Sequence, residues 1–266
     1  MTVRFRKAVV AVLLMALALV VVAAQPAGAA ETRSVSSGSA DSATIYVVQG
    51  LPAKTIDVAI DGDRMAADVA TAKVVGPFEV GAGTHTVTFT DAAGKVVATN
   101  TVSTAAGSNS DVVVHLQTAA SAEPMVTQFA NAVSAIPADK AAVTVAHTAA
   151  VPPADIRVDG KVLFANVANG ESLDVVVPAG TYRVDIVQAG ETAPPVFGPV
   201  DLAVKGGTLT KVYAVGDPAA KTMNVAVHEI TLPRNGSAPP TLIDTGTGGS
   251  AVLLQIFALL TRLWQG

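Results

Sequence analysis

The chain between residues 43 and 233 consists mainly of short runs in which apolar and polar residues alternate. These runs are rich in Val, Ile, Thr, Phe and Tyr, and Gly, Pro, Asn and Asp separate them. A period of two is typical of β-strands that bury one face, and no useful helical periodicity occurs before residue 250. The first half is predicted to form these strands: TIYVVQ, TIDVAI, VGPFEV, THTVTFT, KVVATNTV, DVVVHL and MVTQFA.

The strand pattern occurs twice. Residues 43–62, ATIYVVQGLPAKTIDVAIDG, are similar to residues 141–160, AAVTVAHTAAVPPADIRVDG. Three further pairs of segments follow in the same order and at nearly the same separation: 80–89 with 177–186, 110–117 with 210–217, and 125–130 with 223–228. The sequence therefore predicts a duplicated domain.

The number of strands in each copy predicts the fold class. About seven short strands in about 90 residues are typical of a β-sandwich of immunoglobulin-like size. We therefore predict an all-β protein with two tandem immunoglobulin-like β-sandwiches, at residues 43–135 and 141–233. The short segment IPADK, residues 136–140, would join them.

The N-terminus has the pattern of an export signal. A short basic segment precedes 17 apolar residues, AVVAVLLMALALVVVAA, and Ala27-Gly28-Ala29 then offers a small-x-small cleavage site. This order predicts a signal peptide over residues 1–29, followed by a flexible Ser-rich leader over residues 30–42. The alternative is a retained membrane anchor, because the apolar run approaches the length that spans a bilayer. Pro26 and the small residues after the run favour cleavage.

The C-terminus departs from the strand pattern. Residues 234–250 form a linker rich in Pro, Gly and Thr, and residues 251–266, AVLLQIFALLTRLWQG, are apolar with a helical pattern. A helix of this length is too short to span a bilayer at about 1.5 Å per residue. It could lie on a membrane surface with Phe257 and Trp264 as anchors, dock on a sandwich, or pair with another copy of the chain.

Composition narrows the function classes. The chain carries a net charge of −4 and has no Lys/Arg-rich run, and removal of the first 29 residues would make it more acidic. Nucleic acid is thus excluded as a partner, because affinity for phosphate backbones comes largely from Lys and Arg. The chain also has no cysteine, which excludes thiol catalysis, thiolate zinc sites and iron–sulfur clusters. Each predicted sandwich must be stabilised by its hydrophobic core.

Two elements of each copy resemble a known bacterial exported family, domain of unknown function 4397. VTVAHTAAVPPADIRVDG, residues 143–160, is similar to its opening signature, and VPAGTYRVDI and VGAGTHTVTF are similar to a later strand–turn–strand element. His147, Asp155 and Asp159 fall on the signature, whereas the first copy has Gln49 in place of the histidine. The resemblance spans about 43–233 and implies tandem extracellular or cell-envelope β-sandwiches without an assigned activity.

A repeated Asp-Gly stretch is the first candidate for chemistry. In DVAIDGDRMAAD, Asp57, Asp61, Gly62 and Asp68 match four positions of a calcium-binding EF-hand loop. On a strand, however, Asp57 and Asp61 would lie about 13 Å apart, too far for one ion to bridge. Asp-Gly is also the preferred pair for a two-residue hairpin turn. We therefore predict a hairpin in each copy, and the leading acids Asp57 and Asp155 remain unexplained.

The four histidines are the second candidate. His85, His115, His147 and His228 align with Tyr182, Tyr213, Gln49 and Ala130, so no histidine is shared between the copies. No nucleophile elbow and no zinc-binding spacing accompanies any of them. The sequence therefore predicts no catalytic residue, no metal ligand and no cofactor.

These patterns together favour a secreted or cell-envelope-associated, non-catalytic binding or structural protein. Its candidate partners are a cell-wall polymer or a surface protein, with peripheral membrane contact through residues 251–266, and its oligomeric state is open. The alternative is an extracellular hydrolase with a carboxylate-based site in loops or at the inter-domain cleft. Such a site would bring two acids within about 5–10 Å of each other.

Overall fold

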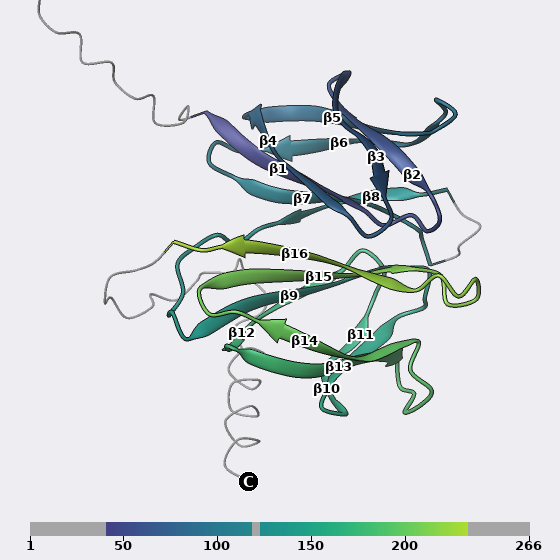
Figure 1. Ribbon diagram of the computed structural model, residues 1–266, viewed down its shortest axis with the longest axis vertical. Helices are drawn as coiled ribbons and strands as arrows, with labels where there is room; N and C mark the ends of the chain where they lie inside the picture. Colours follow the sequence, from purple (N-terminus) through teal and green to yellow (C-terminus); the bar gives the residue numbers. More distant parts are fainter. Residues whose placement is uncertain (1–40, 119–122, 234–266) are drawn as a thin grey trace, which may run out of the picture. The chain divides into compact units, whose positions relative to one another are not determined.

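The computed structural model describes residues 41–118 and 123–233, and in these ranges the chain is all-β (Figure 1). Sixteen strands form four sheets of four strands each. The sheets belong to two pairs, one from each half of this part of the chain. The predicted fold class of tandem β-sandwiches is therefore confirmed.

The predicted terminal segments fall outside the described residues. They are the signal peptide at 1–29, nearly all of the leader at 30–42, the linker at 234–250 and the apolar tail at 251–266. In the ranges that the structure does describe, no helix is long and apolar enough to cross a membrane.

The first sandwich contains eight strands. One sheet has the order β4-β1-β7-β8 and the other has the order β3-β2-β5-β6. Strands β1 and β7 pair in parallel, and all the other pairs are antiparallel. The strand bounds are β1 Ser42–Gln49, β2 Thr55–Ile60, β3 Asp63–Ala70, β4 Val74–Gly81, β5 Gly83–Asp91, β6 Val96–Thr104, β7 Asn109–His115 and β8 Met125–Ala130.

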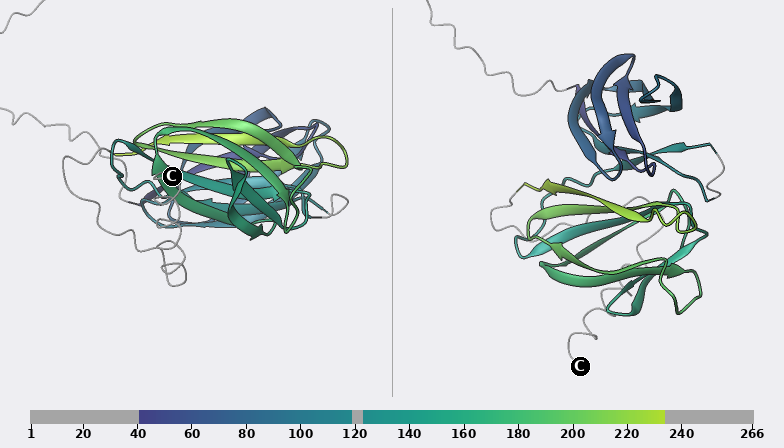
Figure 2. Two further views of the ribbon diagram at one scale, coloured as in Figure 1. Left: turned by 90° about the horizontal axis from the view of Figure 1, so that it is seen from below. Right: turned by 45° about the vertical axis from the view of Figure 1, so that its right-hand side comes forward.

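The second sandwich repeats this topology strand for strand. Its sheets have the orders β12-β9-β15-β16 and β11-β10-β13-β14, and its one parallel pair, β9 with β15, corresponds to β1 with β7. The two layers are visible in Figure 2. The strand bounds are β9 Lys140–Ala149, β10 Ala154–Val158, β11 Lys161–Val167, β12 Ser172–Pro178, β13 Gly180–Gln188, β14 Phe197–Val204, β15 Thr208–Gly216 and β16 Asn224–Thr231.

The structure adds one strand to the seven expected in the first half. Strand β3, DRMAADVA, was not predicted because Asp, Ala and Arg have low β-propensity and its alternation is interrupted by a bulge opposite β2. The strand order also differs from the immunoglobulin constant domain, in which strands A, B, E and D form one sheet and C, F and G the other. Here the first, fourth, seventh and eighth strands share a sheet.

Each sandwich has its own apolar core between its two sheets. In the first, Val58, Val87 and Phe89 point inward from β2 and β5 and are fully buried. The second core includes Ile156, Phe164 and their neighbours. Because side chains alternate along a strand, the Thr residues between the buried positions of β5 lie on the opposite face of its sheet.

Candidate functional site

The Asp-Gly pairs form the predicted hairpin turns. Asp61 and Gly62 connect β2 to β3 with φ of 53° and 90°, and Asp159 and Gly160 connect β10 to β11 with φ of 50° and 76°. Two consecutive positive φ values are the mark of a two-residue type I′ turn. The prediction of a hairpin in each copy is confirmed.

The leading acids stabilise a β-bulge next to that hairpin. Asp57 Oδ1 accepts a hydrogen bond from the Asp68 amide at 2.9 Å, and Asp155 Oδ1 accepts one from the Asn166 amide at 2.7 Å. Asp68 and Asn166 have positive φ, in the stretches where the strand register shifts. Asp155 Oδ2 also accepts the Gly190 amide at 3.0 Å.

The other oxygen of Asp57 accepts a hydrogen bond from Arg64 Nη2 at 2.7 Å. These two donors, the Asp68 amide and then Arg64, lower the pKa of Asp57. Both acids thus have complete local partners. Their recurrence reflects the backbone geometry that both copies share.

His85 is a half-buried residue whose role is taken by a tyrosine in the second copy. Its Nδ1 lies 2.7 Å from Asp61 Oδ2 and its Nε2 lies 2.9 Å from the Gly81 carbonyl oxygen. In the second sandwich, the Tyr182 hydroxyl donates to the Pro178 carbonyl oxygen at 2.8 Å. Both side chains therefore stabilise the turn between the corresponding strands.

His115 is fully buried and held neutral. Because the Leu116 carbonyl oxygen can only accept, Nδ1 donates to it at 2.8 Å, and Nε2 then accepts from the Thr127 hydroxyl at 2.9 Å. Burial lowers the pKa of His115 to about 4. Its arrangement is that of a structural histidine.

His147 corresponds to Gln49, as the sequence predicts, and both hold the loop after their strand. Gln49 hydrogen-bonds the Leu51 amide at 2.7 Å and the Lys54 carbonyl at 3.0 Å, and His147 Nε2 lies 3.2 Å from the Pro152 carbonyl oxygen. Burial lowers the pKa of His147.

The strand registers correct two of the expected histidine alignments. Gln49 pairs with Val114, and His147 pairs with Ala214, so the residue equivalent to His115 is Val215 and not Tyr213. In the same way, the equivalent of His228 is Phe129 and not Ala130, as its pairing with β15 shows. A constant separation between the copies fails here because the loop between β13 and β14, residues 189–196, is longer than the loop between β5 and β6, residues 92–95.

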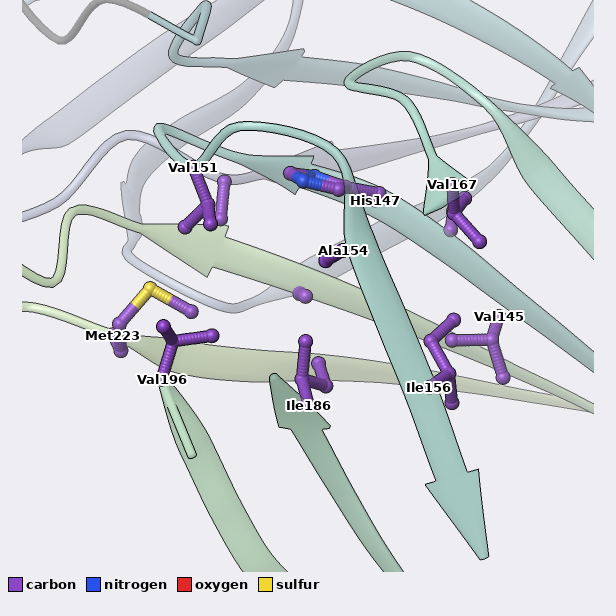
Figure 3. Close-up of a pocket in the computed structure, with 12 residues that line it drawn as sticks. Val145, His147, Val151, Ala154, Ile156, Val167, Ile186, Val196 and Met223 are labelled. Atoms are coloured by element: carbon purple, nitrogen blue, oxygen red, sulfur yellow. The ribbon is translucent and has the colours of Figure 1, made fainter. Parts of the chain in front are cut away.

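His147 also borders a small cavity in the second sandwich (Figure 3). The other lining residues shown there are apolar: Val145, Val151, Ala154, Ile156, Val167, Ile186, Val196 and Met223. The cavity measures about 10 Å³, which is the lower limit for a single water molecule. It is therefore too small for a substrate.

A cluster of buried polar residues joins the two sandwiches. We call Asp111, Asn131, Lys211, Tyr213 and His228 the Asp111 cluster. Asp111 Oδ2 accepts a hydrogen bond from the Tyr213 hydroxyl at 2.6 Å, and Oδ1 accepts one from Asn131 Nδ2 at 2.7 Å. His228 Nδ1 lies 3.0 Å from both oxygens. Since the carboxylate can only accept, Nδ1 carries the proton.

Lys211 completes the cluster from β15. Its Nζ donates to Asn131 Oδ1 at 2.6 Å and to the Ala130 carbonyl oxygen at 2.9 Å, and it lies 4.0 Å from Asp111 Oδ2. The side chains of Lys211 and Asp111 are both completely buried. A buried ion pair requires such additional hydrogen bonds, because the Coulomb attraction alone does not offset the loss of hydration.

The electrostatics of the cluster favour an ionised carboxylate. Burial would raise the pKa of Asp111, but the His228 hydrogen bond, the charge of Lys211 and the Asn131 hydrogen bond together lower it below its usual value. Burial lowers the pKa of Lys211, against the attraction of Asp111 and Asp174. Burial and then the charge of Asp111 raise the pKa of Tyr213 well above its usual value.

Sequence reasoning missed the Asp111 cluster. Asp111 and Lys211 each begin an apolar run, DVVV and KVYAV, and alternation by itself predicts only a strand for each run. The available signal was a charged residue at the same position in both copies, with opposite sign. Only the contact between the sandwiches shows that these two opposite charges pair with each other.

The chemistry open to the cluster is limited by burial. Asp111, Lys211 and Tyr213 are all fully inaccessible to solvent, so no substrate reaches them in this conformation. Nor does the described part of the chain hold any group of three or more His, Cys, Asp or Glu residues placed to bind a metal ion. The cluster is therefore a joint between domains.

An exposed face rich in hydroxyl groups belongs to sheet β3-β2-β5-β6 of the first sandwich. Its hydroxyl-bearing residues are Thr84, Thr86, Thr88 and Thr90 on β5 and Thr99, Thr101 and Ser103 on β6. They form cross-strand pairs, Thr84 with Ser103, Thr86 with Thr101 and Thr88 with Thr99. The last two hydroxyls lie 3.3 Å apart. At the same register, the second sandwich pairs Arg183 with Asp201.

Comparisons with known proteins give a family for part of the chain. No curated protein matches it. A solved structure, that of a candidate cell adhesion protein from Bacteroides eggerthii DSM 20697, is 10% identical, with a TM-score of 0.19 over 72% of this chain and 96% of the other. The family model for the domain of unknown function DUF4397 matches residues 43–157.

The matched segment extends from β1 into β10, so it contains the whole first sandwich. It is one continuous span, and the assignment of a second family copy stays a prediction from the repeat. The predicted resemblance to this family is confirmed over residues 43–157. Residues 43–157 thus match the model of the DUF4397 family, a domain of unknown function.

Proposed function

We propose that this protein is a secreted or cell-envelope-associated binding module without catalytic activity, and that it contacts a cell-wall polymer. The observation that carries the proposal is the hydroxyl face on β5 and β6, which is uncharged, regular and mostly exposed. Hydroxyl groups donate and accept hydrogen bonds, so they complement the hydroxyl and amide groups of a neutral polysaccharide. The export signal that the N-terminal sequence predicts supports a location outside the cytoplasm.

The absence of catalysis is supported by the roles of the polar residues. Asp57, Asp155 and His115 each stabilise local backbone or a neighbouring side chain. The Asp111 cluster joins the sandwiches and is sealed from solvent. With one tryptophan in the whole chain, binding would depend on hydrogen bonds rather than on stacking of sugar rings.

The test is co-sedimentation of the purified protein with wall sacculi, together with a hydrolase screen on the same material. We expect retention without release of soluble fragments. The double variant T86V/T101V removes two paired hydroxyls while keeping β-branched side chains, and we expect it to weaken retention at least fivefold. The single variant T181V, an exposed threonine on β13, is the matched control and should bind like wild type.

Other outcomes separate the alternatives. Release of sugar fragments by the wild-type protein would contradict the non-catalytic proposal and support the alternative of an extracellular hydrolase. Retention of T86V/T101V at the wild-type level would show that the hydroxyl face on β5 and β6 does not bind the polymer. If the sacculi retain nothing while a surface protein does, the polymer is the wrong ligand.

The location has its own test. In cell fractionation, we expect to find the protein in the medium or the cell envelope and not in the cytoplasm. Deletion of residues 250–266 should shift an envelope-bound protein to the medium if the tail is an anchor. An unchanged distribution would contradict that role of the tail.

A further inference from the structure

The two sandwiches contact each other through one sheet face each. The outer face of sheet β4-β1-β7-β8 contributes Val48, Val113 and Phe129, and the outer face of sheet β12-β9-β15-β16 contributes Ala146, Tyr213, Val215 and Ala226. These side chains form one buried apolar cluster. The Asp111 cluster lies in the same contact.

The charged residues of this contact occupy equivalent positions in the two copies. Asp111 lies between Tyr46 on β1 and Phe129 on β8. Lys211 lies in the same way between Thr144 on β9 and His228 on β16. A single site of the repeat therefore carries a carboxylate in one copy and an ammonium in the other.

The contacts are also reciprocal. Asp111 contacts His228, and Lys211 lies over the ring of Phe129, the equivalent of His228, with Nζ 5.8 Å from the ring centroid. At the edges, β4 approaches β16, and Gly170, two residues before β12, approaches Thr127 of β8. When a position of one surface contacts a second position of the other surface, and the equivalent contact occurs in the opposite direction, the two surfaces pair with two-fold symmetry.

Such a pairing would also be open to two identical sandwiches from different chains, were it not for the charges. Two first sandwiches would bury Asp111 against Asp111, and two second sandwiches would bury Lys211 against Lys211. A like-charge pair without water has no attraction to offset its lost hydration. Only a first sandwich with a second sandwich buries opposite charges.

We infer that these two sheet faces form a charge-coded pairing surface whose only partner is the complementary sandwich, from the same chain or from a second copy. When the contact within a chain opens, two copies associate by exchanging sandwiches. The first sandwich of each chain then pairs with the second sandwich of the other. Like sandwiches do not pair. The inference is independent of the proposed ligand.

The test uses two charge-reversed full-length chains, D111K and K211D. Each places like charges across its own contact, so we expect each alone to open and to remain monomeric. Mixed, they can exchange sandwiches, and one contact of the mixed pair then carries the native Asp111 and Lys211. We expect a 1:1 complex with twice the monomer mass in size-exclusion chromatography with light scattering.

The matched control is K205D, which reverses one charge of the exposed Lys205–Glu229 ion pair. It should stay monomeric and form no complex with D111K. Circular dichroism should confirm that all variants keep their β-structure. The inference is overturned if D111K or K211D self-associates as well as the mixture does, or if the folded variants do not combine.

Neutral variants provide a second test if a charge-reversed chain fails to fold. D111N removes the like-charge barrier between first sandwiches, and K211Q removes the barrier between second sandwiches. Each should form concentration-dependent dimers at concentrations at least tenfold below those at which wild type does. Equal association of wild type and both variants would overturn the inference.

Discussion

At the scale of single residues, polar side chains that look like sites prove to stabilise the backbone. Asp57 and Asp155 lead an apolar strand in both copies because each accepts the amide of a bulge residue with positive φ. A bulge leaves an amide without a ladder partner, and a carboxylate supplies the missing acceptor. Recurrence across a duplication therefore identifies shared backbone geometry as readily as shared chemistry.

The variant D155A should destabilise the protein by about 1–3 kcal/mol, because it leaves the partly buried amides of Asn166 and Gly190 without their acceptor. Urea unfolding followed by circular dichroism measures the change. D201A, which removes an exposed carboxylate from β14, is the control and should change the free energy of unfolding by less than about 0.5 kcal/mol. Equal losses would contradict the role of Asp155.

His115 gives the free energy of unfolding a pH dependence. Its pKa is about 4 in the folded protein and about 6.5 when unfolded, so the unfolded chain binds more protons between these values. Stability should therefore fall as the pH decreases from about 6.5 to about 4, by up to roughly 3 kcal/mol from this residue. Denaturation at a series of pH values should show a smaller slope for H115N.

His85 is the control for that pH series. The hydrogen bond with Asp61 raises the pKa of His85, so its contribution is complete below the unfolded pKa and is lost as the pH rises through the folded one. H85Q should therefore keep the wild-type slope between pH 4 and 6. If H115N keeps that slope as well, the buried neutral histidine is not its source.

At the scale of elements, the hairpin turns depend on glycine. Gly62 has φ of 90° and open space around the position of a Cβ atom, so G62A introduces backbone strain without a steric clash. We expect a loss of about 1–2 kcal/mol in the free energy of unfolding. Gly81 has equally open surroundings and no positive φ, so G81A is the matched control. A loss in both variants would show that the turn conformation is not the cause.

At the scale of the whole molecule, the Asp111 cluster couples the sandwiches. Y213F removes the hydroxyl that donates to Asp111 and should cost about 1.5–3 kcal/mol, the range for hydrogen bonds to charged groups. We expect wild type to unfold in one calorimetric transition and Y213F to approach two. The control Y182F removes a hydroxyl bonded to an exposed carbonyl and should retain one transition. Two transitions in the wild-type protein would contradict the coupling of the two sandwiches.

The parts predicted from the sequence are those that local chemistry determines. Alternation identified most strands, Asp-Gly identified both turns, and the repeat identified the two-domain organisation. Strand β3 was missed because its residues have weak strand preferences and a bulge interrupts its alternation. The equivalents of His115 and His228 were misaligned because register is set by hydrogen bonding between strands, which unequal loops conceal.

The sequence by itself determined that this chain builds two all-β units, because side-chain periodicity and turn residues act within a few positions of each other. Tertiary structure alone decided how the strands are ordered in each sheet and what Asp111 and Lys211 do. These residues are far apart along the chain, and each begins an ordinary apolar strand. Their role depends on the contact between the sandwiches, in which both side chains are completely buried. A buried charge without a partner is unstable, and an opposite charge beside it is what stabilises it.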